Sequence, residues 1–501
     1  MSSGAVEEVG HERDESRAGG VPAREFKFSS AFALAFSDIS PIVGIYSVFA
    51  ISIVLAGPGF FWALPLVLIG QLLVTAVFGD LVSKWPFQGS VYAWSRELIG
   101  PRYGWFTNWA YMWGLTLTLS VLGLAAAGYL LGALGVNSAS KEGTAAVALG
   151  IILLGTTANM LGGNVLKRLL YITLACELVA SIGIGTVLLF FHKTQPLSVL
   201  FSGAGSGHAP PVLLGPFLGA VAFVGYSFVG FEAAGSIAEE VAESRRVLPK
   251  AMTLSLAVAG GLVIYACLGV MLAIPSVPDV LSGKVVDPIS TTLETRLGSG
   301  FGRALLIVLT IGFTASLIAV QAAVSRAIWA GARDRALPFA GTLGKLSGRH
   351  RMPRHAIVLT VLISAPLPFI SFSKIYTLLL SFSTAGFYIS YALPVIAFAY
   401  VRLKGRWIPG PVSMGRWGGP VTYVAAVWIV LESVNIAWPR TLNSHWYLNW
   451  GILIMTAVLG VIGYFMATRI LGPGTPGGGR LSTPGGGRVA EAGPAASDQN
   501  V

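Results

Sequence analysis

Charged side chains are scarce in this chain. They make up 11% of the 501 residues, whereas soluble domains carry about 25%. Hydrophobic residues make up 54%, and the same apolar pattern recurs from residue 28 to residue 471. A soluble chain of this length normally divides into several separate cores. The composition therefore excludes an ordinary soluble protein and predicts a polytopic membrane protein, with the lipid bilayer as its first partner.

Cysteine and histidine are also rare. The two cysteines, Cys176 and Cys267, both lie in apolar runs, which argues against a disulfide framework and for small packing residues. The six histidines lie in tails, in loops or at the edge of an apolar run, without a metal-binding spacing to Glu or Cys. The sequence contains no nucleophilic serine motif and no phosphate-binding loop. We therefore expect no enzyme, no metal site and no cofactor.

Basic residues outnumber acidic ones, and the formal net charge is +11. On a soluble protein this charge would suggest a nucleic-acid partner, but here the basic residues lie between the apolar segments. Alternate connections hold 25 of the 33 Lys and Arg residues, the other connections hold 7, and Arg326 lies inside a segment. Because basic loops stay in the cytoplasm, we expect both termini on the cytoplasmic side of the cell membrane and no nucleic-acid partner.

Twelve apolar segments are long enough to cross a bilayer. The alternation of charge supports an even number of crossings. The segments cover approximately Phe28–Ala56, Phe60–Val82, Trp105–Leu134, Thr144–Leu161, Leu169–Phe191, Leu214–Val241, Ala251–Ile274, Phe301–Ala332, Ala356–Phe372, Ile375–Val401, Val421–Trp438 and Asn449–Ile470.

These segments divide the chain into one membrane domain with two tails. Residues 28–471 are expected to form the twelve-helix domain, with two five-span units, the expected repeats, at about 28–191 and 214–401 and extra helices at about 421–471. Residues 1–27 and 472–501 are expected to be disordered cytoplasmic tails, because they have no periodic apolar face.

The connection from Lys84 to Gly104 is aromatic and too polar to span the bilayer. One interpretation is an interfacial or partly re-entrant segment packed under the bundle. The other is a loop anchored at the lipid headgroups by Trp85, Trp94 and Tyr103. The sequence alone leaves both open.

Two apolar segments carry signs of an interrupted helix. In the first segment, Pro41 removes a backbone donor and disfavours helix at Ser40, and Gly44 adds flexibility. In the sixth segment, Gly230 falls at about mid-depth, and the predicted break covers Ser227–Gly230. Prolines and glycines also serve packing in membrane helices. A pair of interrupted helices in corresponding halves nevertheless indicates a transporter's binding site.

The ends of a broken helix suit an amino acid. The second half-helix exposes backbone N–H groups with partial positive charge, which favour a carboxylate. The first half-helix exposes carbonyls, which favour an ammonium group. Two breaks side by side would therefore hold both ends of a zwitterion.

Three stretches resemble one family of membrane carriers. The run GYSFVGFEAAGSIAEEVAESRRVLPKAM of the sixth segment is similar to the signature of the amino acid–polyamine–organocation permeases. The end of the eighth segment fits the family's Ser-Arg…Ala-Arg-Asp-x-x-Leu-Pro, and PFQGSVYAW resembles its Pro-x-Gly-Gly-x-Tyr-x-Trp, although Gln88 and Ser90 depart from that pattern. The stretch FSDISPIVGI resembles the amino acid and choline transporter branch, which includes GABA permeases.

This resemblance implies an all-α, LeuT-like fold with a five-plus-five inverted repeat and broken helices 1 and 6. It implies a secondary active transporter that moves an amino acid, GABA or a related amine by alternating access, through proton-coupled symport or exchange. It also implies an aromatic lid at Phe228 or Tyr226 and a substrate site at Ser40, Pro41, Ile42, Val43, Gly44, Tyr226, Ser227, Phe228, Val229 and Gly230.

Several charged residues keep two interpretations each. Glu232 matches a family position linked to proton coupling, and a carboxylate in an apolar bundle can exchange protons near neutral pH; alternatively it only tethers helices. Glu239 and Glu240 form a cytoplasmic gate with basic residues or a solvated helix end. Arg326 is a gate candidate or reaches the inner interface by snorkelling. Asp38 attracts an amine or caps a half-helix.

Two further alternatives concern energetics and class. Sodium coupling needs a cluster of oxygen ligands, which Thr314 and Ser316 in the eighth segment would supply in part. A sensor that binds an amino acid without moving it would have the same sequence features. The exact substrate, the direction of transport and the oligomeric state do not follow from the sequence.

Overall fold

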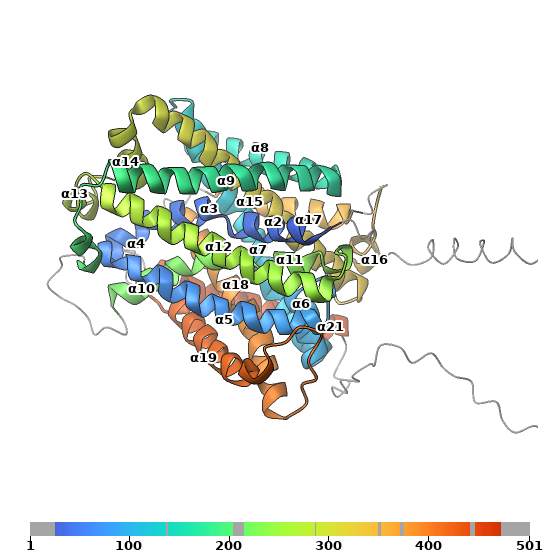
Figure 1. Cartoon of the computed structure of the whole chain (residues 1–501). Helices are drawn as coiled ribbons and strands as arrows, with labels where there is room; N and C mark the ends of the chain where they lie inside the picture. The colour runs from blue at the N-terminus through green and yellow to red at the C-terminus, as the bar shows by residue number, and fades with distance from the viewer. Residues whose placement is uncertain are drawn as a thin grey trace, which may run out of the picture.

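The computed structural model describes residues 26–136, 139–203, 215–285, 287–348, 352–370, 375–440 and 446–471. Within these ranges the chain is almost wholly helical (Figure 1), and its only strand-like pairings are two isolated bridges. The predicted tails lie outside the described residues, except for residues 26 and 27 at the start.

Among the described residues, eleven helical segments are long and apolar enough to cross a membrane, which confirms the predicted polytopic helical membrane protein. The ninth predicted segment corresponds to a shorter apolar stretch, Arg354–Phe369. The count of twelve crossings and the inverted repeat remain predictions. The long helices are α5 (Ala63–Lys84), α7 (Pro101–Ala133), α8 (Lys141–Met160), α9 (Gly163–Phe191), α12 (Ser244–Ala273), α15 (Ser299–Arg333), α18 (Ile375–Leu403), α19 (Gly418–Ala437) and α21 (Gly451–Leu471).

The first and sixth spans are built from short helices instead. The first span comprises α2 (Phe28–Ile39), α3 (Pro41–Tyr46) and α4 (Phe49–Ala56). The sixth comprises α10 (Pro216–Val224), the 3₁₀ turn η4 (Gly225–Phe228) and α11 (Ala233–Ser236). The remaining short helices are α6 (Val91–Leu98), α13 (Val277–Leu281), α14 (Pro288–Leu297), α16 (Ala340–Leu343), α17 (Arg354–Ser364) and α20 (Trp446–Asn449).

The long helices surround these two interrupted spans. Helix α12 packs against α5, α9 and α2, and Figure 1 shows these helices alongside one another. Helix α7 packs against α15 and α18. Helices α19 and α21 lie at the periphery and expose apolar side chains such as Leu431 and Phe465, as expected for helices that face lipid. The interrupted spans are therefore shielded from the bilayer.

The aromatic connection after the second span is packed into the protein. It forms α6, which contacts α7 and α18. Trp94 is fully buried, and its indole N–H donates to the Trp85 carbonyl at 3.1 Å. Ser90 and Gly89 both have positive φ values, 42° and 95°, where the chain turns into α6. Of the two interpretations of this connection, the packed segment is confirmed.

Helices α7 and α18 cross at a pair of glycines. A Cβ placed on Gly386 would lie 2.6 Å from the Cα of Gly114 and 3.3 Å from the carbonyl oxygen of Ala110. Because these neighbours are backbone atoms, neither side can move away without shifting a helix. Small residues at such crossings allow close helix packing in membranes.

We predict that Gly386→Ala destabilises the protein. Overpacking at a tight contact costs about 1–3 kcal/mol. The melting temperature of the purified protein in detergent should fall measurably. Gly128→Ala on α7 is the matched control, since a Cβ there meets no heavy atom within 4 Å. Equal melting temperatures for the two variants would contradict the proposed crossing.

Candidate functional site

The first span is interrupted where the sequence predicted. Helix α2 ends at Ile39, Ser40 adopts φ 45° and ψ 106°, and α3 starts at Pro41. The Ser40 side chain accepts a hydrogen bond from the Val43 N–H at 3.2 Å and so caps the new helix. Pro41 fits there because the first helical residue needs no intrahelical donor. We call residues Ser40–Gly44 the first break.

The sixth span is interrupted at its predicted position as well. Helix α10 gives way to the 3₁₀ turn η4, Val229 is extended, and Gly230 has φ 101°. A Cβ on Gly230 would lie only 2.6 Å from Oδ1 of Asp38. Both the backbone conformation and the lack of space therefore require glycine. We call residues Ser227–Gly230 the second break.

The two breaks touch each other. The Ser227 hydroxyl donates a hydrogen bond to the Gly44 carbonyl at 2.6 Å. Gly44 permits this approach, because a Cβ there would lie 3.3 Å from the Ser227 Cβ and 3.1 Å from Val263. Residues 183 positions apart in the chain are thus joined inside the bundle.

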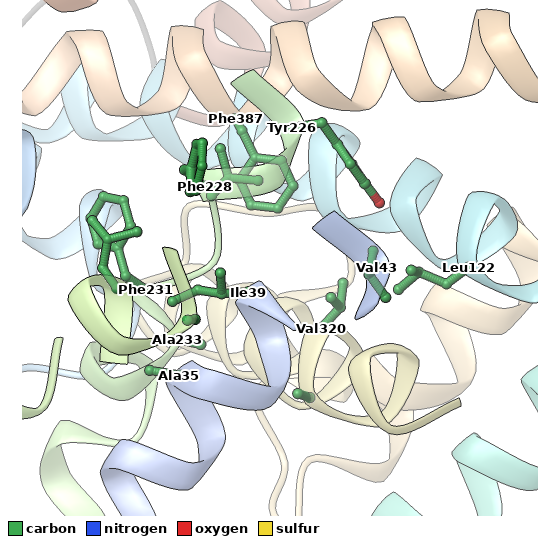
Figure 2. Close-up of a cluster of buried hydrophobic side chains, with 14 of the residues drawn as sticks. Ala35, Ile39, Val43, Leu122, Tyr226, Phe228, Phe231, Ala233, Val320 and Phe387 are labelled. Carbon is green, nitrogen blue, oxygen red and sulfur yellow. The ribbon is translucent and has the colours of Figure 1, made fainter. Parts of the chain in front are cut away.

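All ten residues predicted for the substrate site are buried. Figure 2 shows apolar side chains from several helices around the breaks, among them Leu122 of α7, Val320 of α15 and Phe387 of α18. The hydroxyl of Tyr226 is buried and has no hydrogen-bond partner among the described residues. The structure therefore brings the predicted residues together, although their role as ligands remains a prediction.

Glu232 lies beside the second break and is fully buried. The Tyr111 hydroxyl donates to its Oε1 at 2.8 Å, and the Tyr391 hydroxyl donates to its Oε2. Tyr391 also accepts the Gly230 N–H at 3.0 Å. One tyrosine thus connects the backbone of the second break to the Glu232 carboxylate.

Asp38 approaches the same point from the first span. It is the penultimate residue of α2, and its carboxylate faces Gly230 within electrostatic reach of Glu232. Its Oδ2 has no hydrogen-bond partner among the described residues. Of the two interpretations of Asp38, helix capping is wrong, because Ser40 caps α3 and Asp38 lies inside α2.

Glu177 is a residue near the first break that was not predicted from the sequence. This residue is the only acid in the fifth span. It lies on α9, and its side chain is completely buried. Its carboxylate lies near the Ser40 hydroxyl of the first break, yet neither oxygen makes a hydrogen bond of good geometry to a described residue. In the sequence, the feature that could have identified Glu177 is a single carboxylate within an apolar run. Tyr111 and Tyr391 had no comparable signal, since aromatic residues are common in membrane helices.

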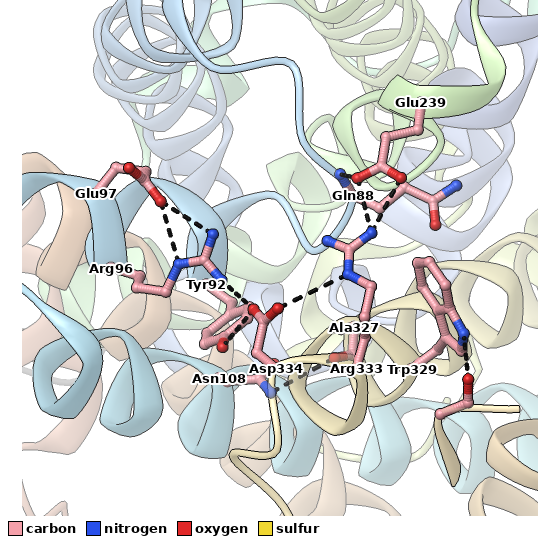
Figure 3. A network of polar contacts seen from close by, with 11 residues as sticks. Gln88, Tyr92, Arg96, Glu97, Asn108, Glu239, Ala327, Trp329, Arg333 and Asp334 are labelled. Atoms are coloured by element: carbon pink, nitrogen blue, oxygen red, sulfur yellow. Dashed lines mark hydrogen bonds and ion pairs between the residues drawn. The ribbon is translucent and has the colours of Figure 1, made fainter. Parts of the chain in front are cut away.

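The predicted gate residues form a polar network at one end of the bundle. Arg326 donates to both carboxylate oxygens of Glu240, at 2.7 and 3.2 Å, and Gln88 donates to Glu240 at 2.8 Å. Glu239 receives two hydrogen bonds of 3.0 Å from Arg333 (Figure 3). The solvated-end interpretation of Glu240 is wrong, since only 13% of its side chain is exposed.

Arg326 does not snorkel. Only 3% of its side chain is exposed, and the Glu240 ion pair holds the guanidinium inside the protein. Glu240 provides an acceptor within the protein, so the guanidinium does not extend to the inner interface.

A second group of the same network joins α6 to the end of α15. Arg96 pairs with Asp334, and the Tyr92 hydroxyl donates to the same carboxylate at 2.8 Å (Figure 3). Burial, together with the nearby Asp334 charge, raises the pKa of Tyr92. The hydroxyl therefore keeps its proton and remains a donor to Asp334.

Comparison with known proteins agrees with this architecture. The model of the amino acid permease family matches residues 26–462. The chain belongs to this family. The permease is 25% identical to the amino-acid permease BAT1 of Arabidopsis thaliana, over 89% of this chain and 91% of that protein. It is 23% identical to the branched-chain amino acid permease BcaP of Bacillus subtilis, over 88% and 92%.

A further relative is a putative amino acid/polyamine transporter of Macrophomina phaseolina, 22% identical over 81% of this chain and 93% of that protein. The family assignment confirms the resemblance to the amino acid–polyamine–organocation permeases. The permease is therefore a multi-pass membrane transporter of amino acids and not an enzyme.

The buried ion pair yields a stability prediction. Glu240→Gln leaves the Arg326 guanidinium buried without its counter-charge, which typically costs 3–5 kcal/mol, so a loss of about this size is expected. The permease should melt at a clearly lower temperature in detergent. Glu243→Gln is the control, because Glu243 is exposed. A melting temperature equal to that of the control would show that the pair contributes nothing.

Proposed function

We propose that the permease is a secondary active carrier that binds one amino acid between the two breaks and moves it across the cell membrane by alternating access. The observation that carries this proposal is the hydrogen bond between Ser227 and the Gly44 carbonyl, which brings the two breaks together. Interrupted backbone at membrane depth is tolerated only inside protein or along a cavity. Both breaks here meet inside the bundle, where a substrate would contact the ends of the short helices.

The substrate ends would be recognised by opposite helix ends. The carbonyl end of α2 and the carboxylate of Asp38 suit the substrate ammonium group. The N-terminal ends of α3 and α11 carry partial positive charge, which suits the substrate carboxylate. In this structure the Val43 N–H is bonded to the Ser40 side chain and the Ala233 N–H to the Gly230 carbonyl, so a substrate carboxylate would compete with these partners. In this proposal Tyr226 or Phe228 covers the substrate as an aromatic lid.

Glu232 is the proposed proton carrier. It lies within reach of a second carboxylate, Asp38, and in an apolar surrounding a proton on either group removes their repulsion. Through Tyr391, Glu232 contacts the Gly230 N–H of the substrate site. Loss or gain of a proton there would therefore change the backbone that holds the substrate.

The network around Glu239, Glu240 and Arg326 is the proposed inner gate. The breaks are buried, and two ion pairs hold the segment after the sixth span against α15. A hydrogen bond from Gln88 ties the turn before α6 to the same segment. Opening toward the cytoplasm would require these pairs to separate. The charge distribution between the spans supports this orientation, with both termini in the cytoplasm.

A carrier for an amine, such as GABA, choline or a polyamine, is the second candidate. The unpartnered Oδ2 of Asp38 favours it, because a buried carboxylate oxygen without a donor is suited to a substrate cation.

Sodium coupling is less well supported by the hydroxyls proposed for it. The Thr314 hydroxyl donates to its own helix, and that of Ser316 donates to the Asp38 carbonyl at 3.2 Å.

The coupling role is tested by uptake into proteoliposomes at two external pH values. Glu232→Gln imitates the protonated side chain, so acid-stimulated uptake should become independent of pH. Glu142→Gln, an exposed residue on α8, should behave like the parent. If Glu232→Gln keeps both the rate and the pH dependence of the parent, the proton role is refuted. Uptake that requires sodium at both pH values would favour the sodium alternative.

The substrate site is tested by Gly230→Ala. The new Cβ would meet Asp38 at 2.6 Å, and φ 101° is unfavourable for alanine. Binding of a radiolabelled amino acid should weaken by about tenfold or more, equivalent to about 1.4 kcal/mol. Gly261→Ala on α12 is the control, since its Cβ would meet no heavy atom within 4 Å. Unchanged affinity in a folded Gly230→Ala protein would place the substrate elsewhere.

A further inference from the structure

A second buried polar cluster contacts the sixth span, away from the residues assigned above. Its members come from α5, α18 and α19: Gln71, Tyr388 and Glu432, all less than 4% exposed, with Asn435 and Arg440 beside them. Helix α19 lies outside the proposed repeats. A carboxylate buried on a peripheral helix is costly and usually functional.

The cluster holds α10 near its beginning. The Asn435 amide donates both to the Leu218 carbonyl at 3.0 Å and to Oε2 of Glu432 at 3.1 Å. Arg440 donates to the Asn435 side-chain oxygen at 2.5 Å. The Asn435 amide is thus oriented by a carboxylate on one side and a guanidinium on the other. Its contact with α10 depends on both.

The same cluster contacts the sixth span again at the other end of α10, just before the second break. The Tyr388 hydroxyl donates to the Gly225 carbonyl at 3.3 Å, where α10 passes into η4. Gly225 leaves room for this contact, because a Cβ there would lie 3.0 Å from the Tyr388 oxygen. Tyr388 also lies near the Gln71 amide and in the field of Glu432.

Several hydrogen bonds of the cluster are unmade in this structure. Oε1 of Glu432 and both polar side-chain atoms of Gln71 make no hydrogen bond of good geometry to a described residue. Buried polar atoms are normally paired, and unpaired ones call for an explanation. Around Tyr388 the cluster therefore has spare donors and acceptors that a different position of α10 or α19 can use.

We propose that Glu432 is a positioning residue of the transport cycle, which holds the outer half of the sixth span against α19 through Asn435. When α10 leaves α19 during opening, Asn435 gives up the Leu218 carbonyl, and the unpaired atoms of Gln71 and Glu432 gain new partners. The inference rests on the proposed alternating access, because only then does α10 have to move. Glu432 acts through Asn435 and does not touch the substrate.

The test measures how often α10 opens, without any substrate. Cysteine is placed at Ala220, a fully buried residue of α10, in a Cys176→Ala, Cys267→Ala background. The full-length protein in detergent is labelled with a water-soluble maleimide, and the labelling rate is followed by mass spectrometry. The rate is compared among the parent, Glu432→Gln and Asn435→Ala.

Both substitutions are expected to speed labelling by about fivefold, the change expected from weakening one hydrogen bond. Glu294→Gln is the matched control, an exposed carboxylate on α14, and it should label at the parent rate. A rate within about twofold of the parent in both variants, or equal acceleration in the control, would overturn the proposal. If Glu432→Gln fails to fold, Asn435→Ala decides alone.

This outcome is separable from that of the proposed function. Accelerated labelling without amino acid uptake by the parent protein would show that Glu432 holds α10 against α19, but it would refute the carrier and with it a role in a transport cycle. Normal uptake by the parent with unchanged labelling of both variants would refute only the role of Glu432.

Discussion

The need to satisfy backbone groups inside a bilayer dominates this structure. Lipid offers no hydrogen bonds, so a helix can break only where the protein supplies partners. The first break caps itself with the Ser40 side chain, and its Gly44 carbonyl receives the Ser227 hydroxyl of the second break. This hydrogen bond therefore satisfies one polar group of each break. The surrounding long helices keep both breaks away from lipid.

Buried carboxylates depend on the same enclosure. Glu232 receives two tyrosine hydroxyls from α7 and α18, helices that are far apart in the chain. Glu240 receives Arg326 and Gln88. Asp38 and Glu177, close to the first break, retain oxygens without a well-formed hydrogen bond to any described residue. The bundle thus pairs the acids of its gate network with arginines. It leaves carboxylate oxygens near the breaks without well-formed hydrogen bonds among the described residues, and there a substrate or a proton would bind.

Close helix packing makes these contacts possible. Gly114 and Gly386 bring α7 and α18 into backbone contact, and the same two helices present Tyr111 and Tyr391 to Glu232. Gly230 and Gly225 likewise bring the sixth span within reach of Asp38 and Tyr388. In a membrane, where burial of apolar surface does not drive helices together, small residues of this kind decide which polar groups can meet.

Much of this protein followed from its sequence, because the bilayer imposes strong local rules. Long apolar runs predicted the spans, and Pro41 and Gly230 predicted the breaks, since both act on their own backbone. The partners of Glu232 and Glu240 did not follow. Tyr111, Tyr391 and Arg326 lie about 86 to 159 positions from the acids they bind. Only the packing of helices that are distant in the sequence brings such groups together. The residues around each acid do not show which side chain of another helix will contact it.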